Sequence, residues 1–340
     1  MPFLGGSALK EAYRRAQRGG YAYMANNIAE PNTLLGLLDA YTEAKSDLVV
    51  QISPGAAKYA GGGDKLAGLR ALSGLISVLA VNRPIGVFIN LDHFTTQELA
   101  LMDVAIRERL VSSIMIDASA ESFEANIRAS AEVVRMAKGS GILVEAELGK
   151  IRGVEDEISS DEAFYTHPDE AVEFVRASGA DLLAIAIGTE HGVSKGRKIE
   201  LRVDLAKAIQ AKLHEAGLDT PLVLHGSSGL LPGQVRDAIR YGVCKLNKDT
   251  HYQYVYSRAA CEFYLKNSRA IMPPDGVEDD IVDLFSKSDW SPDKKLFDPR
   301  VAGKLVQEKI KWIAGELLAQ GSSGGHANPS GESDSSTAKR

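Results

Sequence analysis

Residues 222–247 read LVLHGSSGLLPGQVRDAIRYGVCKLN, which is a strand-like apolar run, a segment with helical spacing and a second short run. The two runs predict strands at Leu222–Gly226 and Val243–Asn247, and the middle segment predicts a helix at Pro232–Tyr241. Continuous apolar runs such as LVL are typical of parallel strands that are buried on both faces. This stretch therefore predicts one strand–helix–strand unit of a parallel sheet.

The same alternation extends over most of the chain. Six further strands are predicted at Tyr21–Asn27, Asp47–Ser53, Gly86–Asp92, Ser112–Asp117, Ile142–Gly149 and Leu182–Gly188. Helical spacing lies between them at Pro31–Ala44, Asp64–Ala80, Thr96–Leu110, Glu121–Ala137, Pro168–Ser178 and Val203–Ala216. Eight such units favour a closed barrel over an open doubly wound sheet, and no GxGxxG pattern follows the first strand. We therefore expect an α/β fold, a TIM (β/α)8 barrel of parallel strands.

The C-terminal part departs from this alternation. Residues from about 268 to 297 are rich in Pro, Asp and Gly, which predicts a surface excursion within one barrel domain that spans residues 1–320. A last helix is predicted at Val301–Leu318, as a C-terminal helical extension. Residues 321–340 contain almost no apolar side chains, so they predict a disordered tail.

Composition restricts the class of protein. With 44% hydrophobic and 25% charged residues, the chain reads as an ordinary globular protein. Its net charge of -6 provides no basic surface for nucleic acid, so any phosphate site must be local. The two cysteines, Cys244 and Cys261, have no metal or redox spacing, and no apolar run approaches the ~18 residues of a membrane span. We expect a cytoplasmic protein with neither a membrane nor a nucleic-acid partner.

Three histidines follow predicted strands directly. His93 ends FINLDH, His191 ends IAIGTEH and His225 ends LVLH. A parallel barrel brings the carboxyl ends of all its strands to one rim, so these imidazoles are expected to meet. Neutral imidazoles from separate strands can surround Zn²⁺ at ~2.0–2.1 Å and leave positions open for a substrate. Each histidine alone could be an ordinary hydrogen-bonded residue, but together they predict a zinc site; the role of His251 stays open.

A possible anion site follows the last two strands. In LHGSSG, the small residues after His225 would let backbone N–H groups approach an anion, and two serine hydroxyls add donors. Barrels often build a phosphate site from the loops after strands seven and eight. Asp249 and Thr250 lie in the second of these loops, where they could also simply cap a helix.

Carboxylates supply candidate acids and bases. Asp92 precedes a candidate metal ligand, which would hold its carboxyl group against a bound substrate. Asp117 and Glu147 end neighbouring strands, where a buried acid without a cation would be costly. The loop KIRGVEDEISS contains Glu155 and Glu157, and it is typical either of a mobile lid or of a solvated charged loop.

The motifs occur in a fixed order along the chain. They are ANN, QIS, LDH, MIDAS, EAELG, GVEDE, FYTHP, AIGTEHG, LHGSSG, KLNKDT and DPRV. From about Tyr21 to Arg300 this series resembles the class II, metal-dependent fructose-bisphosphate aldolases. The resemblance implies reversible cleavage of fructose 1,6-bisphosphate to dihydroxyacetone phosphate and glyceraldehyde 3-phosphate, a step of glycolysis and gluconeogenesis. MIDAS, VEAELG and AIGTEHG also resemble the tagatose-1,6-bisphosphate aldolases, which stay an alternative.

The resemblance implies specific roles for the rim residues. It assigns the catalytic zinc to three histidines: His93, His191 and His225. Asp92 would give a proton to the aldehyde oxygen, and Glu155 in the lid loop would move the proton at the reacting carbon. Asp117 and Glu147 match positions that hold a second divalent metal in some members, and a monovalent cation is a further possibility.

The resemblance also implies the residues that bind the sugar bisphosphate. They are Asn27, Ser53, Gly192, Lys195, Gly226, Ser227, Ser228, Asn247, Lys248, Asp249, Thr250 and Arg300. Most would hold the C1 phosphate of dihydroxyacetone phosphate, with Asn247 near the enediolate. Arg300 would grip the far phosphate across a dimer, which implies a homodimer or a larger homo-oligomer. The chain has Gly226–Ser227 where the family usually has a glycine pair, and it lacks the common aromatic residue before Lys195.

Other mechanisms stay open at this point. A Schiff-base aldolase on the same barrel would use Lys245 or Lys150, because a lysine with a depressed pKa can attack a ketone. A metal-dependent hydrolase barrel would typically carry an HxH pair on its first strand, which here reads YAYMANN. A phosphate-binding barrel without catalytic activity would not need an acid such as Asp92 beside a metal ligand.

Overall fold

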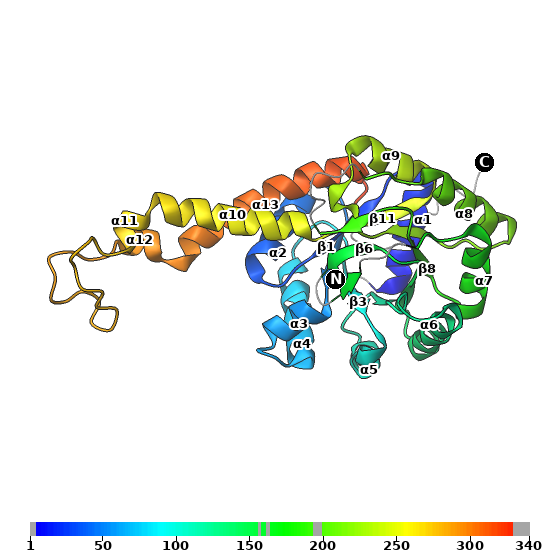
Figure 1. Cartoon of the computed structure of the whole chain (residues 1–340), viewed down its shortest axis with the longest axis horizontal. Helices are drawn as coiled ribbons and strands as arrows, with labels where there is room; N and C mark the ends of the chain where they lie inside the picture. The colour runs from blue at the N-terminus through cyan, green and yellow to red at the C-terminus, as the bar shows by residue number, and fades with distance from the viewer. Residues whose placement is uncertain (1–4, 156–157, 161–163, 193–198, 329–340) are drawn as a thin grey trace.

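The computed structural model describes residues 5–155, 158–160, 164–192 and 199–328, and it confirms the TIM barrel. Eight parallel strands close in the order β1-β11-β10-β8-β5-β4-β3-β2, with helices around them (Figure 1). The barrel strands are β1 (Tyr23–Asn27), β2 (Leu48–Ile52), β3 (Val87–Phe94), β4 (Ser113–Ile116), β5 (Leu143–Leu148), β8 (Leu182–Ile185), β10 (Leu222–Leu224) and β11 (Val243–Lys248).

Several outer helices begin where the sequence supplies capping groups. The side chains of Glu30, Asp64 and Ser122 accept hydrogen bonds from backbone N–H groups of the first turn that follows each of them. The full set of outer helices is α2 (Pro31–Ala44), α3 (Pro54–Ala60), α4 (Lys65–Ala80), η1 (Thr96–Glu98), α5 (Leu99–Arg107), α6 (Phe123–Ala137), α7 (Pro168–Ser178), α8 (Val203–Glu215) and α9 (Pro232–Arg240). In the part of the chain that the structure describes, no helix is both long and apolar enough for a membrane span.

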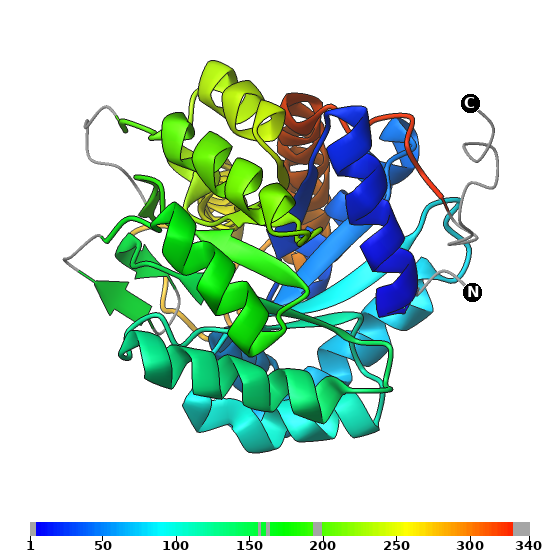
Figure 2. The ribbon, with the colours of Figure 1, turned by 90° about the vertical axis from the view of Figure 1, so that its right-hand side faces the viewer.

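The helix α1 (Gly6–Gly19) was not predicted, and it closes one end of the barrel. It lies in front of the barrel strands when the molecule is viewed from the end opposite the arm described below (Figure 2). Its buried face, with Leu9, Tyr13 and Ala16, belongs to the same apolar cluster as Tyr23 and Phe88 of the barrel interior. Because α1 fills the amino-terminal end of the barrel, the carboxyl-terminal rim is the end that can hold a site.

Two long helices extend from the barrel as an arm. The helices α10 (Thr250–Lys266) and α13 (Pro299–Gly321) pack side by side, and the short α11 (Ser268–Ile271) and α12 (Lys294–Phe297) lie at the far end (Figure 1). Residues 268–297 form this end, at the position of the predicted excursion. Several of its apolar side chains are exposed, among them Val282, which is 93% exposed.

The segment that follows α13 packs against the barrel. Ser323 is buried, and its hydroxyl accepts a hydrogen bond from that of Ser46 at 2.9 Å. The N–H of Asn328 donates to the buried carboxylate of Asp47 at 2.8 Å. The predicted disorder is therefore wrong for residues 321–328, because hydrogen bonds, the stacking of His326 on Tyr21 and the packing of Ala327 against the core hold this segment. Residues 329–340 lie outside the described part of the chain.

Truncations separate the two parts of this segment. Deleting residues 329–340 is expected to leave thermal stability unchanged. Deleting residues 322–340 removes one of the two hydrogen bonds to Asp47 Oδ1, the other coming from the N–H of Gly86. A loss of about 1–2 kcal/mol would lower Tm by roughly 3–6 °C. Thermal unfolding followed by circular dichroism measures both variants, and equal Tm values would show that residues 322–328 contribute nothing.

Candidate active site

His93 reaches the rim through a strained backbone. Its φ of 52° lies in the left-handed region, and the pairing of β3 with β4 shifts register between Leu91 and Phe94. A non-glycine residue in this conformation costs about 1–3 kcal/mol, and such residues cluster at functional sites. The result is that the imidazole of His93 lies against the imidazole of His225, with ring centroids 4.7 Å apart.

The three predicted histidines form one cluster. The ring of His191 lies 5.3 Å from that of His93 and 6.5 Å from that of His225, measured between centroids. His93 Nε2 and His225 Nδ1 face each other at 2.9 Å. All three side chains are buried, and burial lowers the pKa of His225, which favours the neutral imidazole that can bind a metal.

Two carboxylates decide which ring nitrogens face inward. Asp117 Oδ2 lies 2.9 Å from His93 Nδ1, and Glu145 Oε1 lies 2.8 Å from His225 Nε2. Burial raises the pKa of Asp117, but hydrogen bonds with His93 and Ser119 outweigh it and hold that pKa well below its usual range. Carboxylates that bind the outer nitrogen of a histidine are characteristic of metal centres. Asp117 therefore orients the ring of His93, and its predicted role in binding a second metal stays a prediction.

Two groups of donor atoms among the described residues fit a divalent cation, and His191 belongs to neither of them. Nitrogen ligands on a tetrahedral zinc ion lie about 3.3 Å apart, given Zn–N bonds of ~2.0–2.1 Å. The separation of 2.9 Å between His93 Nε2 and His225 Nδ1 is close to this value. Asp92 offers a third ligand atom within 4.8 Å of both. His93, Asp117 and Glu147 form a second group within the same distance, which fits a second ion.

Three amide groups hold the carboxylate of Asp92. Asn27 donates to Oδ2 at 2.9 Å, while Gln51 and Asn247 donate to Oδ1 at 2.9 Å and 2.8 Å. The amide oxygens of Asn27, Gln51 and Asn247 are buried and accept no hydrogen bond from the described residues. Because buried polar atoms normally have partners, a bound molecule rich in hydroxyl groups fits this position. Sequence reasoning missed Gln51, although a polar residue in the apolar run LVVQI was a signal.

Lys245 is buried in the barrel interior and pairs with Glu145, the residue that also contacts His225. Its Nζ lies 2.7 Å from Glu145 Oε2, and both side chains are fully buried. Burial raises the pKa of Glu145, but Lys245 and His225 outweigh it and lower that pKa to about 2. Glu145 therefore links a buried cation to a candidate metal ligand. A lysine engaged in this way is a poor Schiff-base nucleophile, which argues against that alternative.

The glycine–serine loop is tied to its neighbours. Gly226 has φ 59°, and a Cβ atom there would lie 2.8 Å from backbone atoms of Glu190 in β9 (Glu190–His191). The next residues form the short helix η2 (Ser227–Gly229). Ser227 Oγ donates to the carbonyl of Asn247 at 2.7 Å. Glycine is therefore required for the close approach of this loop to β9.

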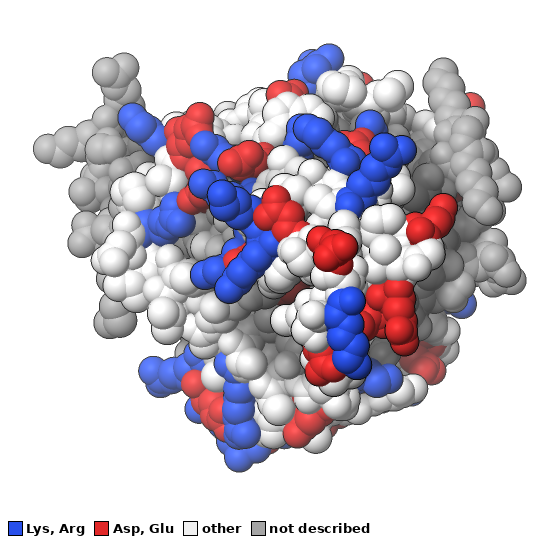
Figure 3. Space-filling model, turned by 90° about the vertical axis from the view of Figure 1, so that its left-hand side faces the viewer, with Lys and Arg blue, Asp and Glu red and all other residues white. Residues whose placement is uncertain are grey.

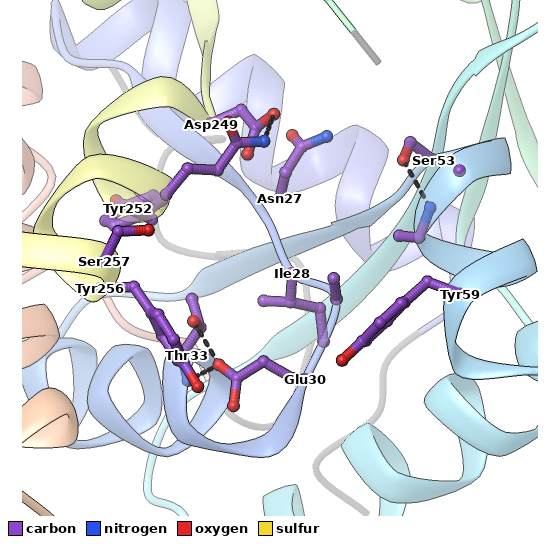
Figure 4. A pocket seen from close by; sticks show the side chains of 14 residues that line it. Asn27, Ile28, Glu30, Thr33, Ser53, Tyr59, Asp249, Tyr252, Tyr256 and Ser257 are labelled. Atoms are coloured by element: carbon purple, nitrogen blue, oxygen red, sulfur yellow. Dashed lines mark hydrogen bonds between the residues drawn. The ribbon is translucent and has the colours of Figure 1, made fainter. Parts of the chain in front are cut away.

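A pocket of about 400 Å³ opens beside Asn27, one of the amide groups that hold Asp92. Ser53, Asn27 and Asp249 line it, together with the tyrosines of α3 and α10 (Figure 4). Asp249 lies at the start of α10, but its side chain makes no capping hydrogen bond to the backbone. The carboxylate of Asp249 instead accepts from Gln253 at 2.7 Å, so helix capping does not explain this residue.

For the remaining predicted site residues within the described part of the chain, the structure gives the position in the fold. The backbone of Glu155 ends β6 (Arg152–Glu155), which pairs with β7 (Ile158–Ser160) and lies parallel to β9, beside His191. Lys195 and Glu157 lie outside the described residues. Gly192 follows β9 with φ 76°, Thr250 begins α10, and Ser228 is half-buried in η2.

Two residues predicted to bind the substrate, Lys248 and Arg300, are not among those that line the pocket of this chain; for Arg300 the predicted contact was across a dimer. Lys248 is 1% exposed and donates to the carbonyl of Ser227, so it lies behind the loop. Arg300 lies in the first turn of α13 on the arm, where its 87% exposed side chain pairs with Asp298. Neither residue lines the pocket, because Lys248 points outward from the barrel and the arm carries Arg300 away from it.

Comparisons with known proteins agree with this site. The family model described as fructose-bisphosphate aldolase class-II matches residues 7–325. The chain is 35% identical over 286 residues to the fructose-bisphosphate aldolase of Thermus caldophilus, covering 77% of this chain and 89% of that protein. It is 34% identical over 268 residues to that of Geobacillus stearothermophilus, covering 78% and 88%.

Solved structures share the fold. A fructose-bisphosphate aldolase from Campylobacter jejuni superposes with a TM-score of 0.79 at 24% identity, covering 94% of this chain and 95% of the other. The YdjI aldolase from Escherichia coli K12 gives 0.70 at 26% identity, covering 94% and 98%. With a family model matched over nearly its whole length and two relatives above 30% identity, the chain belongs to the class II fructose-bisphosphate aldolase family.

Proposed function

We propose that this chain is a metal-dependent aldolase that reversibly cleaves fructose 1,6-bisphosphate into dihydroxyacetone phosphate and glyceraldehyde 3-phosphate, in glycolysis and gluconeogenesis. One observation carries the proposal: three buried histidines meet on the barrel rim beside a fixed carboxylate, Asp92, and a glycine–serine loop. The names of the two curated relatives support the same substrate.

The metal would be held by His93, His191 and His225, with Zn²⁺ as the ion that imidazole ligands suit. A bound divalent cation supplies Lewis-acid stabilisation of the negative charge that develops when the bond beside the ketone breaks. Asp117 and Glu145 bind the two outer ring nitrogens, which directs the inner nitrogens of His93 and His225 toward each other. Glu147, near His93 and Asp117, is the proposed ligand of a second divalent ion.

Two acids are needed because protons move at two atoms of the substrate. Asp92 is the proposed donor to the aldehyde oxygen, since Asn27, Gln51 and Asn247 hold its carboxylate in one position. Glu155 is the proposed acid at the reacting carbon, because it ends β6, the strand whose Gly153 pairs with His191 of β9. Fixed orientation of such groups is itself a large part of the rate enhancement.

The glycine–serine loop is the proposed site of the C1 phosphate. Gly226, Ser227 and Ser228 offer backbone N–H groups and hydroxyls, and Gly192 lies in the neighbouring loop. Lys195, Asp249 and Thr250 are proposed to complete this site, with Asn247 beside the reacting carbons. Ser53, which the resemblance assigned to the C1 phosphate, faces the pocket from the side opposite Asp249, so we propose that it serves the far end of the substrate instead (Figure 4).

Coupled assays test this function. We expect turnover of fructose 1,6-bisphosphate that a chelator abolishes and added zinc restores, with tagatose 1,6-bisphosphate cleaved more slowly. Faster cleavage of the tagatose substrate would correct the substrate but not the reaction. Activity that resists the chelator, or a lysine adduct trapped by borohydride, would refute the metal mechanism.

The site is proposed to be completed in a homodimer or larger homo-oligomer. The pocket beside Asn27 contains no lysine or arginine among its described lining residues, although the substrate has a second phosphate. Arg300 lies in the first turn of α13, one of the helices of the arm in Figure 1, and it is not among the described residues that line the pocket of its own chain. We propose that Arg300 of one copy reaches the pocket of another.

Mixing two inactive variants tests this arrangement. Arg300→Ala and His191→Ala are each expected to lose most activity as pure proteins. Re-equilibrated dimers of an equal mixture should recover roughly a quarter of wild-type activity, because half are hybrids with one complete site each. No recovery, in a mixture shown by mass spectrometry to contain hybrids, would mean that Arg300 does not act across copies.

We also propose the cytoplasm as the location. Cys244 is a buried free thiol and Cys261 an exposed one, which suits a reducing compartment. The proposed partners are the sugar bisphosphate, the triose phosphates and further copies of the chain, with no nucleic acid.

A further inference from the structure

Lys248 is a buried lysine that the proposed chemistry does not yet use. It is the last residue of β11, and its side chain is 1% exposed. Lys245 and Asn247 of the same strand face the barrel interior, where they contact Glu145 and Asp92. Strand alternation therefore sends Lys248 outward, into the layer between the strands and the helices.

The ammonium group of Lys248 contacts the back of the glycine–serine loop. Its Nζ donates to the carbonyl of Ser227 at 2.8 Å. No carboxylate among the described residues lies within 4 Å of it, in contrast to Lys245, which is paired with Glu145. A buried cation without an anion is costly, so this arrangement calls for a counter-charge from elsewhere.

The neighbourhood of Lys248 disfavours positive charge until an anion arrives. Burial lowers the pKa of Lys248 to about 7. Burial and the nearby Lys248 lower the pKa of His251, the titratable residue that follows in α10, to about 4. Uncompensated groups of this kind are more common at functional sites than in ordinary cores.

We propose that Lys248 is a positioning residue of the phosphate loop, where it anchors the carbonyl of Ser227 from behind and so turns the N–H of Ser228 toward the substrate phosphate. The inference rests on the proposed phosphate site. In a trans peptide the C=O and N–H bonds point in opposite directions, so fixing the carbonyl of Ser227 on Lys248 aims the next N–H away from it. Ser227 Oγ, bound to the carbonyl of Asn247, fixes the same residue a second time.

A local cation is useful because the surface does not supply one. On the face that carries the arm, acidic and basic side chains are intermixed (Figure 3), and the whole chain has a net charge of -6. A broad field would therefore not attract a sugar phosphate. A positive charge behind the loop acts at short range and in a medium of low dielectric constant, where its effect is larger.

The test replaces Lys248 and measures phosphate binding separately from turnover. Lys248→Met removes the charge at similar length, and Lys248→Arg keeps it. With Lys248→Met, we expect KM for fructose 1,6-bisphosphate and the inhibition constant of inorganic phosphate to rise about tenfold, while kcat falls less than threefold. That pattern indicates lost binding rather than lost chemistry. Lys248→Arg should recover most of the affinity, and the zinc content should be unchanged in both variants.

Controls distinguish this inference from the proposed function. Ser228→Ala should weaken phosphate inhibition if the loop holds phosphate. If Ser228→Ala weakens inhibition but Lys248→Met leaves the inhibition constant within twofold of wild type, the role of Lys248 is refuted and the phosphate site stands. If neither variant changes it, the loop is not the phosphate site. Should Lys248→Met fail to fold, Lys248→Gln replaces it in the test, because glutamine is uncharged and one atom shorter and so loses both the charge and the reach to Ser227; the same tenfold and twofold limits apply.

Discussion

Replacing His191 by alanine is expected to abolish zinc binding and aldol cleavage together. His191 is one of only three imidazoles in the rim cluster, and two remaining nitrogens do not hold a catalytic zinc ion firmly. We expect less than about 0.1 equivalent of zinc after dialysis and a loss of at least about 10³-fold in kcat/KM. Atomic emission spectrometry and the coupled cleavage assay measure the two quantities on the same preparation.

His214→Ala is the matched control, because His214 is exposed on α8, which covers the outside of the barrel. It should keep wild-type zinc content and activity. A His191→Ala protein that retains full turnover would remove His191 from the metal site. A protein that keeps its zinc but loses its activity would make His191 a substrate-binding residue instead.

Replacing Asp92 by alanine is expected to leave zinc in place and remove catalysis. The three histidines keep their mutual contacts, whereas the group proposed to move the proton is lost. General acid–base catalysis by one side chain typically contributes about 10²–10⁴-fold, and we expect a loss of this size in kcat for both cleavage and condensation. Steady-state kinetics in the two directions, with zinc content measured in parallel, provide the check.

A graded variant tests whether position matters as well as charge. Gln51→Ala keeps the carboxylate but removes one of the two amides that donate to Asp92 Oδ1. We expect an intermediate loss of about tenfold in kcat. Unchanged kinetics in Asp92→Ala would exclude Asp92 from proton transfer, and loss of zinc in that variant would make it a metal ligand.

The strands and the histidine cluster could be predicted because both depend on local pattern. Short apolar runs identify strands, and a parallel barrel necessarily gathers the residues that follow them. His93, His191 and His225 needed only this rule. The helix α1 was missed because no strand precedes it, although Leu9, Tyr13 and Ala16 already had helical spacing.

The supporting contacts could not be predicted in the same way. Strand alternation puts Glu145 on the same face as Glu147, and Lys245 on the same face as Asn247. The sequence does not reveal that Glu145 contacts both Lys245 and His225. These contacts depend on how β5 is staggered against β11 across the barrel. The inward-facing nitrogen of each histidine depends on such contacts.

Residues outside the barrel interior were hardest to place. A motif match assigned Lys248 and Arg300 to the substrate, with Arg300 acting across a dimer; Lys248 lies behind the loop, and Arg300 lies on the arm. Lys248 points outward because side chains alternate along β11 and Asn247 before it points inward. Arg300 lies on the arm because the long helix α10 carries the chain away from the rim. Neither property is visible in a short motif.

Anomalous X-ray diffraction from crystals of the zinc-loaded protein, recorded on both sides of the zinc absorption edge, tests the central claim most directly. The account requires one strong peak within bonding distance of His93 Nε2, His225 Nδ1 and a ring nitrogen of His191. A fully active protein with no peak among these three rings, or with its zinc bound elsewhere, would contradict it.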